Sequence, residues 1–150
     1  IQASMTDTID TRYLETLLGY NTRRATLTII SRFIERMAAF DLRPVDFSVL
    51  SLIGHNPGIT SRQLCHALNI LPPNMVGFLK EFEKRALIDR TPHPTDGRAM
   101  GLSLTTKGQQ LMQKAEVAAV ESDSSAASGL TATEQKTLMR LLQKIYLHRD

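Results

Sequence analysis

The fold is decided by residues 60–105, TSRQLCHALNILPPNMVGFLKEFEKRALIDRTPHPTDGRAMGLSLT. The stretch opens with residues 60–63, TSRQ, a capping box in which the threonine hydroxyl and the glutamine amide satisfy each other's backbone donors. A short helix follows and breaks over residues 69–73, because neither proline there can continue a helix interior. Pro73 then opens a second helix, predicted over residues 74–86, whose apolar residues keep i, i+3, i+4, i+7 spacing.

The hydrophobic period changes after this second helix. Residues 87–91 and 99–105 read as two short strands, and the second alternates apolar side chains with Gly101 and Ser103. Their connection contains Asp96-Gly97, a pair that favours tight turns. We therefore predict a β-hairpin with a polar tip.

Helices are predicted on both sides of this stretch. Residues 11–40 read as one long helix with two apolar stripes rotated by roughly 150° from each other, so one neighbour cannot cover both. Either the helix joins its own domain to a second subunit, or it kinks near Gly19. A buried helix begins at Pro44 and ends before Gly54. Further helices are predicted over residues 106–127 and after a second capping box at residues 131–134, with Leu138, Leu141, Leu142 and Ile145 facing inward.

Three helices followed by a two-stranded hairpin is the order of a winged helix-turn-helix. We therefore predict a mainly α fold with a small β-hairpin wing and a helical dimerisation region. The 150 residues suit one domain, since domains run to roughly 100–200 residues. The winged part is expected over about 44–105, and the dimerisation helices over about 8–40 and 106–150.

The formal charge of +3 comes from 18 Lys and Arg against 15 Asp and Glu. The surplus lies between residues 58 and 110, which hold seven basic and four acidic side chains. This middle part is a candidate surface for a polyanion, although on charge alone chance is an equally good explanation. No apolar run approaches the roughly 18 residues of a membrane span, and no secretory signal opens the chain. We expect a cytoplasmic protein without a membrane partner.

The two helices of the fold-deciding stretch give a DNA-binding surface. The N-terminus of the first can meet a phosphate. The second has the size for a major groove, where Asn74 can bond a base edge, Lys80 can reach a base or a phosphate, and Gly77 lets the duplex approach. The candidate DNA-binding residues on these helices are Ser61, Arg62, Pro73, Asn74, Gly77 and Lys80.

The hairpin supplies the remaining candidates for DNA binding. Its tip presents His93 and Arg98 to the adjacent minor groove, where a narrow A·T-rich stretch concentrates negative potential. Arg90 contacts a phosphate or forms an ion pair. A carboxylate repels DNA, so Asp96 is predicted to form an ion pair with Arg90 or Arg98 that stiffens the tip.

Residues 96–108 follow the pattern D-x-R-x-x-x-L-x-L-T-x-x-G, and here the sequence resembles the MarR family of bacterial transcription regulators. Residues 82–90, FEKRALIDR, are similar to that family's usual end of the recognition helix, with Ala86 in place of a customary glycine. The resemblance covers nearly the whole chain. It implies an obligate homodimer that reads a pseudo-palindrome, with a ligand pocket between the dimer region and the DNA-binding lobe. Gly77 stands where many relatives have a base-reading side chain, which favours shape readout.

Residues 17–25, LLGYNTRRA, resemble regulators of hydroxycinnamate and other aromatic-acid breakdown. That resemblance implies an aromatic acid or its CoA thioester as effector. Arg23 and Arg24 are candidate partners of a carboxylate or phosphate, while Tyr20 and Phe47 are candidates to stack on a ring. Alternatively, the two arginines are surface charges on a dimerisation helix.

Other functions find less support. The sequence lacks G-x-S-x-G, a P-loop and a paired catalytic carboxylate, so we expect no enzyme and no cofactor. His55, His66, His93 and His148 have no metal-ligand spacing, and Cys65 is expected to be buried and structural. We predict a homodimeric repressor that binds double-stranded operator DNA and is released by the aromatic effector. The alternatives are a helical interaction adaptor without DNA binding, and a regulator that responds to oxidation or metal.

Overall fold

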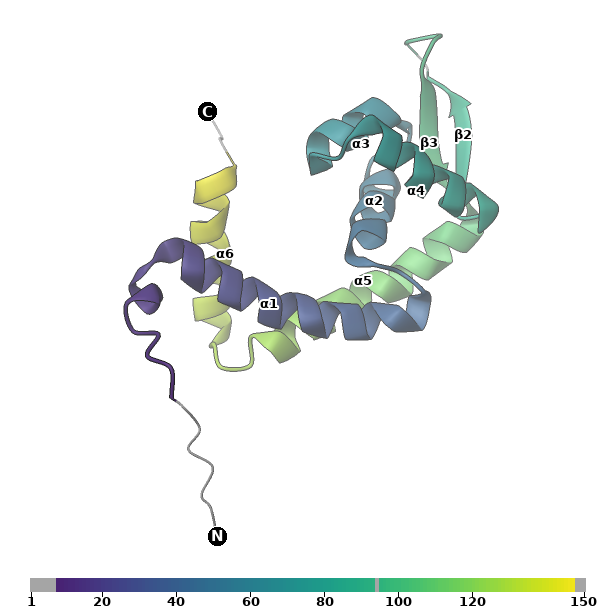
Figure 1. The fold of residues 1–150 in the computed structure, drawn as a ribbon. Coiled ribbons are helices and arrows are strands. Elements are labelled where there is room, and N and C mark those ends of the chain that lie inside the picture. The colour runs from purple at the N-terminus through teal and green to yellow at the C-terminus, as the bar shows by residue number, and fades with distance from the viewer. Residues whose placement is uncertain (1–7, 94, 148–150) are drawn as a thin grey trace.

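The computed structural model describes residues 8–93 and 95–147. Its elements follow in chain order (Figure 1): the 3-10 helix η1 (Leu14–Thr16), α1 (Leu18–Met37), the 3-10 helix η2 (Ala38–Phe40), α2 (Pro44–His55), β1 (Ile59–Thr60), α3 (Ser61–Leu68), α4 (Pro72–Lys84), β2 (Ile88–Pro92), β3 (Met100–Leu104), α5 (Thr106–Ala126) and α6 (Ala132–Tyr146). The fold is mainly α with a small antiparallel sheet, which confirms the predicted class.

A lobe formed by α2, α3, α4 and the sheet lies at one end of the molecule (Figure 1). Its centre is apolar: Leu50 and Ile53 of α2, Leu64 of α3, and Leu79 and Phe82 of α4 have at most 1% of their surface exposed. Burying a side chain of this kind contributes roughly 1.5–3 kcal/mol. The core of the lobe therefore lies on the helix faces that the apolar spacing predicted.

The sheet has three strands in the order β1-β3-β2, all antiparallel. β2 and β3 form the predicted hairpin, with Ile88 opposite Leu104. The sequence pattern did not indicate the third strand, β1, which pairs Ile59 with Leu102 on the other edge of β3. Two residues, the second of which is the Thr60 cap of α3, carry no period of their own, so only the neighbouring strand defines β1.

Both predicted capping boxes are confirmed. At α3 the N–H of Gln63 donates to Oγ1 of Thr60 (3.2 Å), and the N–H of Thr60 donates to Oε1 of Gln63 (2.9 Å). At α6 the corresponding bonds join Thr131 and Glu134, at 3.1 and 2.9 Å. The carboxylate of Glu134 accepts the N–H and a second bond from Thr131, which lowers the pKa of Glu134 below its ordinary value. These local contacts fix where α3 and α6 begin.

The beginning of the first long helix differs from the prediction. Leu17 has an extended backbone (φ −97°, ψ 129°), so the helix predicted over residues 11–40 is divided into η1 and α1. The side-chain amide of Asn21 donates to the carbonyls of Glu15 and Leu17, each at 2.8 Å, and stabilises this break. The break lies two residues before Gly19, near which a kink was one of the two alternatives that the sequence left open.

Several other helix limits also differ from the predictions by one or two residues, among them the end of α2 and the start of α4. α2 continues through Gly54 to His55, because a glycine in a helix interior costs only about 1 kcal/mol. α4 begins at Pro72 rather than Pro73, since the first helical residues have no intrahelical partner for an N–H. Neither shift changes which residues face the core.

α1 and α5 lie side by side and carry the lobe at one end (Figure 1). Arg36 forms an ion pair with Glu121 at 2.9 Å, and Arg32 donates to the hydroxyl of Ser125 at 2.8 Å. The ion pair is about half exposed and contributes at most about 1 kcal/mol. Apolar contact along the two helices therefore supplies most of their attraction.

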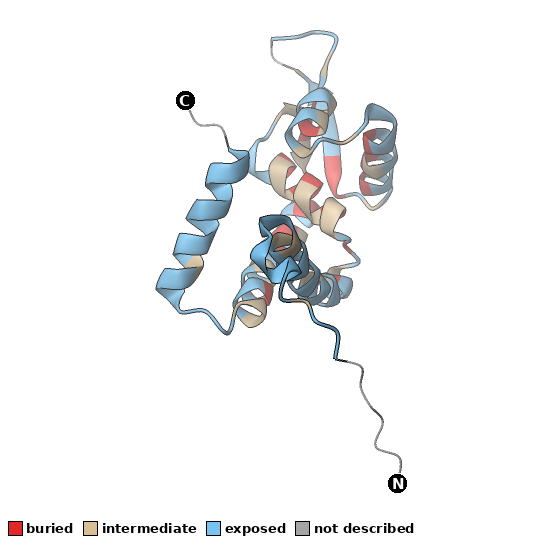
Figure 2. Cartoon of the chain, turned by 60° about the vertical axis from the view of Figure 1, so that its left-hand side comes forward, coloured by how far each residue is buried: buried red, intermediate tan, exposed pale blue. Residues whose placement is uncertain are grey.

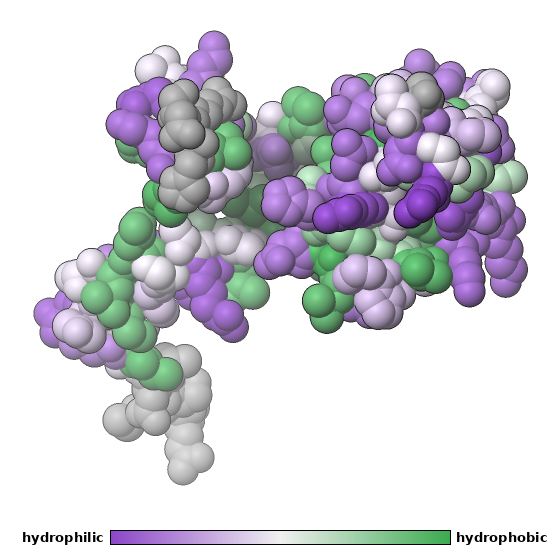
Figure 3. All heavy atoms as spheres, turned by 90° about the horizontal axis from the view of Figure 1, so that it is seen from above, coloured by the Kyte–Doolittle hydropathy of each residue, from purple (hydrophilic) through white to green (hydrophobic). Residues whose placement is uncertain are grey.

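α6 stands apart from the lobe and is almost wholly exposed (Figure 2). Its apolar stripe has exposed fractions of 42, 46, 36 and 57% at Leu138, Leu141, Leu142 and Ile145, respectively. The prediction that this stripe faces inward is wrong for a single chain. Exposed apolar side chains also gather at the start of the helical region, at Leu14, Leu17 and Leu18. Figure 3 shows hydrophobic surface, in green, on the side of the molecule away from the lobe. Two apolar surfaces thus lie open at the end of the chain opposite the lobe.

Within residues 8–93 and 95–147, no helix has the length and apolarity that crossing a membrane requires. The same residues contain no cluster of three or more His, Cys, Asp or Glu that could hold a metal ion. His148 lies outside the described residues. Cys65 is a free thiol on α3 and is half-buried rather than fully buried.

Candidate nucleic-acid interface

One face of α4 is turned away from the core of the lobe. Met75 and Phe82 are buried, whereas Pro73, Gly77 and Lys80 are exposed on the opposite side of the helix. The 13 residues of α4 span about 20 Å at 1.5 Å per residue. A helix of this length with one free face has the dimensions that a major groove accepts.

Asn74 and Val76 flank this exposed face on its two sides. Asn74 is exposed and lines a cleft that α4 shares with α1 and the start of α2. Val76 is 44% exposed on the other side of the helix. Val76 was not among the predicted DNA-binding residues, although an apolar residue off the buried stripe of a helix is a visible signal. A valine in a major groove can contact the methyl group of thymine.

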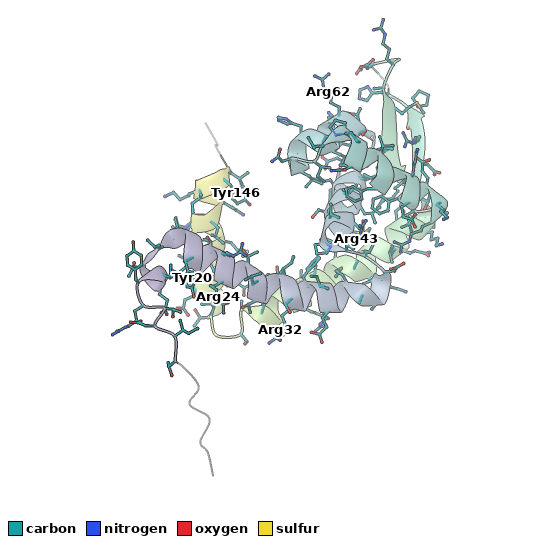
Figure 4. All side chains as sticks on the ribbon, viewed as in Figure 1. Tyr20, Arg24, Arg32, Arg43, Arg62 and Tyr146 are labelled. Atoms are coloured by element: carbon teal, nitrogen blue, oxygen red, sulfur yellow. The ribbon has the colours of Figure 1, made fainter. Side chains whose placement is uncertain are left out.

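The first residues of α3 differ in their exposure. Arg62 projects outward from the lobe (Figure 4), and its side chain is free to reach a phosphate. Ser61 is half-buried and begins the helix directly after the Thr60 cap. Arg62 is therefore the more accessible of the two predicted phosphate contacts.

The wing is joined to α4 by an ion pair that the sequence did not specify. Nε of Arg90 on β2 donates to Oε1 of Glu83 on α4, and both side chains are about 40% exposed. Arg90 was predicted either to contact a phosphate or to form an ion pair, and in the structure it forms an ion pair, with Glu83. Its partner Glu83 fixes the base of the wing against the recognition helix.

The predicted ion pair of Asp96 is wrong. Oδ1 of Asp96 accepts the backbone N–H of Arg98 at 3.1 Å, and within the described part of the chain it has no ion pair with Arg90 or Arg98. A two-residue turn lets a carboxylate bond the backbone beyond it, which is the ordinary behaviour of aspartate in turns. The guanidinium of Arg98 stays exposed at the wing tip.

His93 lies at the other side of the same tip and is half-buried. Its ring Nδ1 accepts the backbone N–H groups of Thr95 and Asp96, at 3.3 and 3.2 Å. Nδ1 is therefore engaged with the hairpin, and a contact of His93 with the minor groove stays a prediction. The exposed cation of the tip is Arg98.

A cleft of about 940 Å³ separates α4 from the C-terminal end of α1 and the start of α2. Its lining residues are Ile34, Ala38, Asp41, Leu42, Arg43, Pro44, Asp46, Pro73, Asn74, Gly77, Phe78, Glu81 and Arg85. The cleft thus joins the recognition helix to the long helices. It has the volume of a site for a small organic molecule.

Arg43 extends into this cleft region (Figure 4). Its guanidinium donates two bonds to Asp46, at 3.0 and 2.9 Å, and lies 5.3 Å above the ring centre of Phe78 on α4. The bonds to Asp46 raise the pKa of Arg43 above its ordinary value. Arg85, also on the cleft, donates to the carbonyls of Phe40 and Asp41, so two arginines hold the recognition helix to the η2–α2 corner.

The predicted effector residues are not brought together within one chain. Tyr20 and Arg24 lie in the first half of α1, far from Arg43 (Figure 4). Phe47 packs edge-to-face on Phe33, with ring centres 5.1 Å apart. Thirteen residues of helix separate Tyr20 from Phe33, which is about 20 Å. A single small ligand cannot touch both groups in one chain.

Comparison with known proteins identifies the lobe. Residues 40–99 match the MarR family. The chain is 32% identical to the transcriptional repressor CouR, whose structure bound to a 23-mer DNA duplex has a TM-score of 0.86 and covers 94% of this chain and 100% of that one. The chain belongs to the MarR family.

Two further relatives agree with the MarR assignment. A candidate transcriptional regulator of the hcr operon in Thauera aromatica is 28% identical over 130 residues, which are 86% of this chain and 78% of that protein. The MarR family protein Rv2887 of Mycobacterium tuberculosis, in complex with salicylic acid, is 25% identical with a TM-score of 0.70, over 86% of this chain and 96% of that one. This MarR chain is accordingly a DNA-binding transcription regulator and not an enzyme.

The turn between α4 and β2 contains a residue in a left-handed conformation, Ala86. Ala86 has φ 58°, a left-handed conformation, at the position where the family usually has glycine. A side chain in this conformation costs roughly 1–2 kcal/mol. The N–H of Leu87 donates to the carbonyl of Phe82 at 2.9 Å, so the turn closes in spite of that cost.

The two cleft arginines of this MarR chain, Arg43 and Arg85, were not among the predicted site residues. Arg43 directly precedes the Pro44 that opens a helix, which is a signal of a helix start and not of a binding site. Arg85 follows the last turn of α4 and reads as a charge that complements the helix dipole. Only their position on opposite walls of one cleft indicates a joint role.

Proposed function

We propose that this chain is a cytoplasmic, homodimeric repressor that binds double-stranded operator DNA and releases it when a small aromatic carboxylate, or its CoA thioester, binds. The observation that carries the proposal is that one lobe holds both an exposed face of α4, with Pro73, Gly77 and Lys80, and a wing whose tip exposes Arg98. Figure 1 shows that this lobe lies apart from α6. One helix in a major groove and one wing in the neighbouring minor groove is the docking mode that this placement permits.

The homodimer is supported by the uncovered apolar surfaces of α6 and of the N-terminal helical region. Leu18 is 66% exposed and Ile145 57%, although both belong to regular helices. Contiguous apolar surface of this kind marks a protein interface. A second copy of the chain placed there gives two lobes, and hence two recognition helices for a pseudo-palindromic operator.

On DNA, the residues of the lobe divide by chemistry. Arg62, Lys80 and Arg98 carry positive charge to phosphates or a groove, and Asn74 offers an amide to a base edge. Pro73 and Gly77 let the duplex approach the helix. Ser61 and His93 stay secondary candidates, and Arg90 acts through its ion pair with Glu83.

Arg98→Ala is expected to weaken operator binding by about 10-fold or more, because the exposed cation of the wing tip is lost. Selection from a random-sequence duplex library supplies the operator, and fluorescence anisotropy gives Kd over a series of salt concentrations. The salt slope should fall by about one. Arg140→Ala, an exposed cation on α6, is the control and should leave Kd unchanged. If selection enriches no sequence, the repressor proposal fails and the interaction adaptor takes its place.

We place the effector in the cleft beneath α4. The carboxylate would pair with the Arg43 guanidinium, and the ring would occupy the space beside Phe78. The Rv2887 complex with salicylic acid supports an aromatic acid as ligand of a relative. A ligand there contacts both α4 and the end of α1, so it favours a position of α4 that no longer matches successive major grooves, about 34 Å apart. Tyr20, Arg23 and Arg24 form the second candidate site.

Salicylate or a hydroxycinnamoyl-CoA thioester is expected to raise the Kd for the operator by about 5- to 150-fold. Arg43→Lys should remove most of that response, because lysine keeps the charge but cannot pair with a carboxylate through two parallel bonds. Arg24→Lys is the matched control on α1 and should respond as wild type does. If the Arg24 variant loses the response and the Arg43 variant keeps it, the site lies at the start of α1 instead.

A further inference from the structure

The imidazole of His93 occupies an unusual place in the wing. Nδ1 lies within hydrogen-bond distance of three groups: the N–H of Thr95 (3.3 Å), the N–H of Asp96 (3.2 Å) and the hydroxyl of Thr95 (3.2 Å). The backbone closes the same loop, because His93 N–H donates to the carbonyl of Ala99 at 3.0 Å. A nitrogen that accepts backbone N–H groups carries no proton, so the geometry requires the neutral ring with its proton on Nε2.

Hydrogen bonds connect this ring to the exposed cation at the tip. Asp96 donates its N–H to His93, and its carboxylate accepts the N–H of Arg98 at 3.1 Å. The carbonyl of Asp96 also accepts the N–H of Ala99 at 3.1 Å. The backbone of Arg98 is therefore set by Asp96, and Asp96 is set by the histidine ring.

The cleft beside the His93 ring contributes no other titratable side chain, so the charged groups to consider are those of its own loop. A cleft of about 490 Å³ beside His93 is lined by Leu52 and Asn56 of α2, residues 57–59, and Gln63 and Ala67 of α3, none of which titrates. The charged residues that hydrogen bonds connect to the ring are Asp96, through its backbone N–H, and Arg98, through its bond to Asp96. The ring is half-buried against uncharged neighbours, so its role in the loop rests on hydrogen bonding.

We propose that His93 is the positioning residue of the wing: its unprotonated Nδ1 holds the loop that presents Arg98 to DNA, and protonation of that atom releases the loop. The proposal rests on the DNA-binding role of Arg98. It gives the regulator a pH-dependent wing, since histidine is the side chain that gains a proton between about pH 8 and pH 5. A histidine that merely contacted DNA would behave oppositely, because its protonation adds a positive charge and strengthens binding.

Two substitutions test whether the hydrogen-bond acceptor at the position of Nδ1, and not the imidazole ring as a whole, holds the loop. His93→Asn places an amide oxygen where Nδ1 stands, whereas His93→Gln places it at the position of Nε2. At pH 8, the Asn variant should keep the wild-type Kd for the selected operator, and the Gln variant should lose about 10-fold, as expected for two missing hydrogen bonds. Between pH 8 and pH 5.5 the ratio of wild-type Kd to that of the Asn variant should rise by about 10-fold. Equal Kd values for the two variants at pH 8, or a falling ratio, would overturn the proposal.

A measurement without DNA tests the same hydrogen bonds. Long-range ¹H–¹⁵N spectra of the free protein at pH 8 should give His93 the tautomer with the proton on Nε2. The amide resonances of Thr95 and Asp96 should shift together with the ring as the pH falls, and should not shift in the Asn variant. A proton on Nδ1 at pH 8 would reject the positioning role of His93 even if operator binding is normal. Loss of all operator binding with the expected spectra would instead reject the function proposed for the lobe.

Discussion

The double variant Leu138→Glu/Leu142→Glu is expected to be a monomer that binds the operator about 10²–10⁴-fold more weakly than wild type. Both leucines belong to the exposed stripe of α6, at 42 and 36% exposure. Two carboxylates in a dimer interface must lose their water without gaining a partner, which is more costly than the apolar contact they replace. A monomer then engages one half-site and loses the gain from binding two half-sites at once. Light scattering coupled to chromatography gives the mass, and anisotropy gives Kd.

The control for this variant carries the same two charges on the other side of α6. Thr133→Glu/Gln143→Glu changes two exposed residues roughly 130–150° from the stripe and should stay dimeric with unchanged Kd. Far-ultraviolet circular dichroism should be the same for all three proteins, because glutamate is a good helix former. A dimeric Leu138/Leu142 variant, or a monomer with wild-type affinity, would contradict the proposed dimer.

Gly108→Ala should lower the free energy of unfolding by about 2–5 kcal/mol, through overpacking and the loss of a helix cap. A Cβ at Gly108 would lie 2.2 Å from the carbonyl oxygen of Leu87, which accepts the N–H of Thr105 at 3.0 Å. Thr105 in turn caps α5 by accepting the N–H of Gly108 at 3.0 Å, and its hydroxyl donates to Ala86 at 2.7 Å. Backbone cannot rotate away as a side chain can, so α5 must move off the turn that precedes β2.

The matched control is Gly77→Ala, which adds the same methyl group in the middle of α4. No other atom lies within 4 Å of the new Cβ, and alanine is favoured over glycine in a helix by roughly 1 kcal/mol. This variant should be more stable than wild type. Urea unfolding at one fixed protein concentration measures both changes, since dimer stability depends on concentration. Equal midpoints for the Gly108 variant and wild type would show that the turn adapts to the methyl group.

The sequence predicted most of the lobe because its signals are local. Each capping box joins residues only three positions apart, Thr60 with Gln63 and Thr131 with Glu134. The two helix starts can therefore be predicted from a short stretch of sequence. The spacing of Met75, Leu79 and Phe82 likewise predicted which side of α4 is buried. A kink near Gly19 was one alternative, but the exact break at Leu17 was not predicted, because an extended residue between two helical segments leaves no mark in the apolar period.

The chemistry of the candidate interface was less predictable. Arg62, Lys80 and Arg98 are exposed, as charged residues off a buried stripe usually are. The roles of Arg90, His93 and Asp96 depended on which neighbours the turn brought within about 3 Å, and a sequence gives residue types without those distances. Tyr20 and Phe47 were both predicted to stack on the ring of the effector because both are aromatic. Phe47 instead packs on Phe33, which lies 13 residues along α1 from Tyr20.

The sequence by itself determined the helices, the wing, the buried stripes and, through residues 96–108, the family. Those features arise from contacts a few residues apart, which the order of the letters specifies directly. Only the tertiary structure decided that Glu83 holds Arg90, that β1 joins the sheet, that Arg43 and Arg85 share one cleft with α4, and that the stripe of α6 lies uncovered. These features join separate elements of the chain, so they depend on how whole helices pack and not on any local pattern.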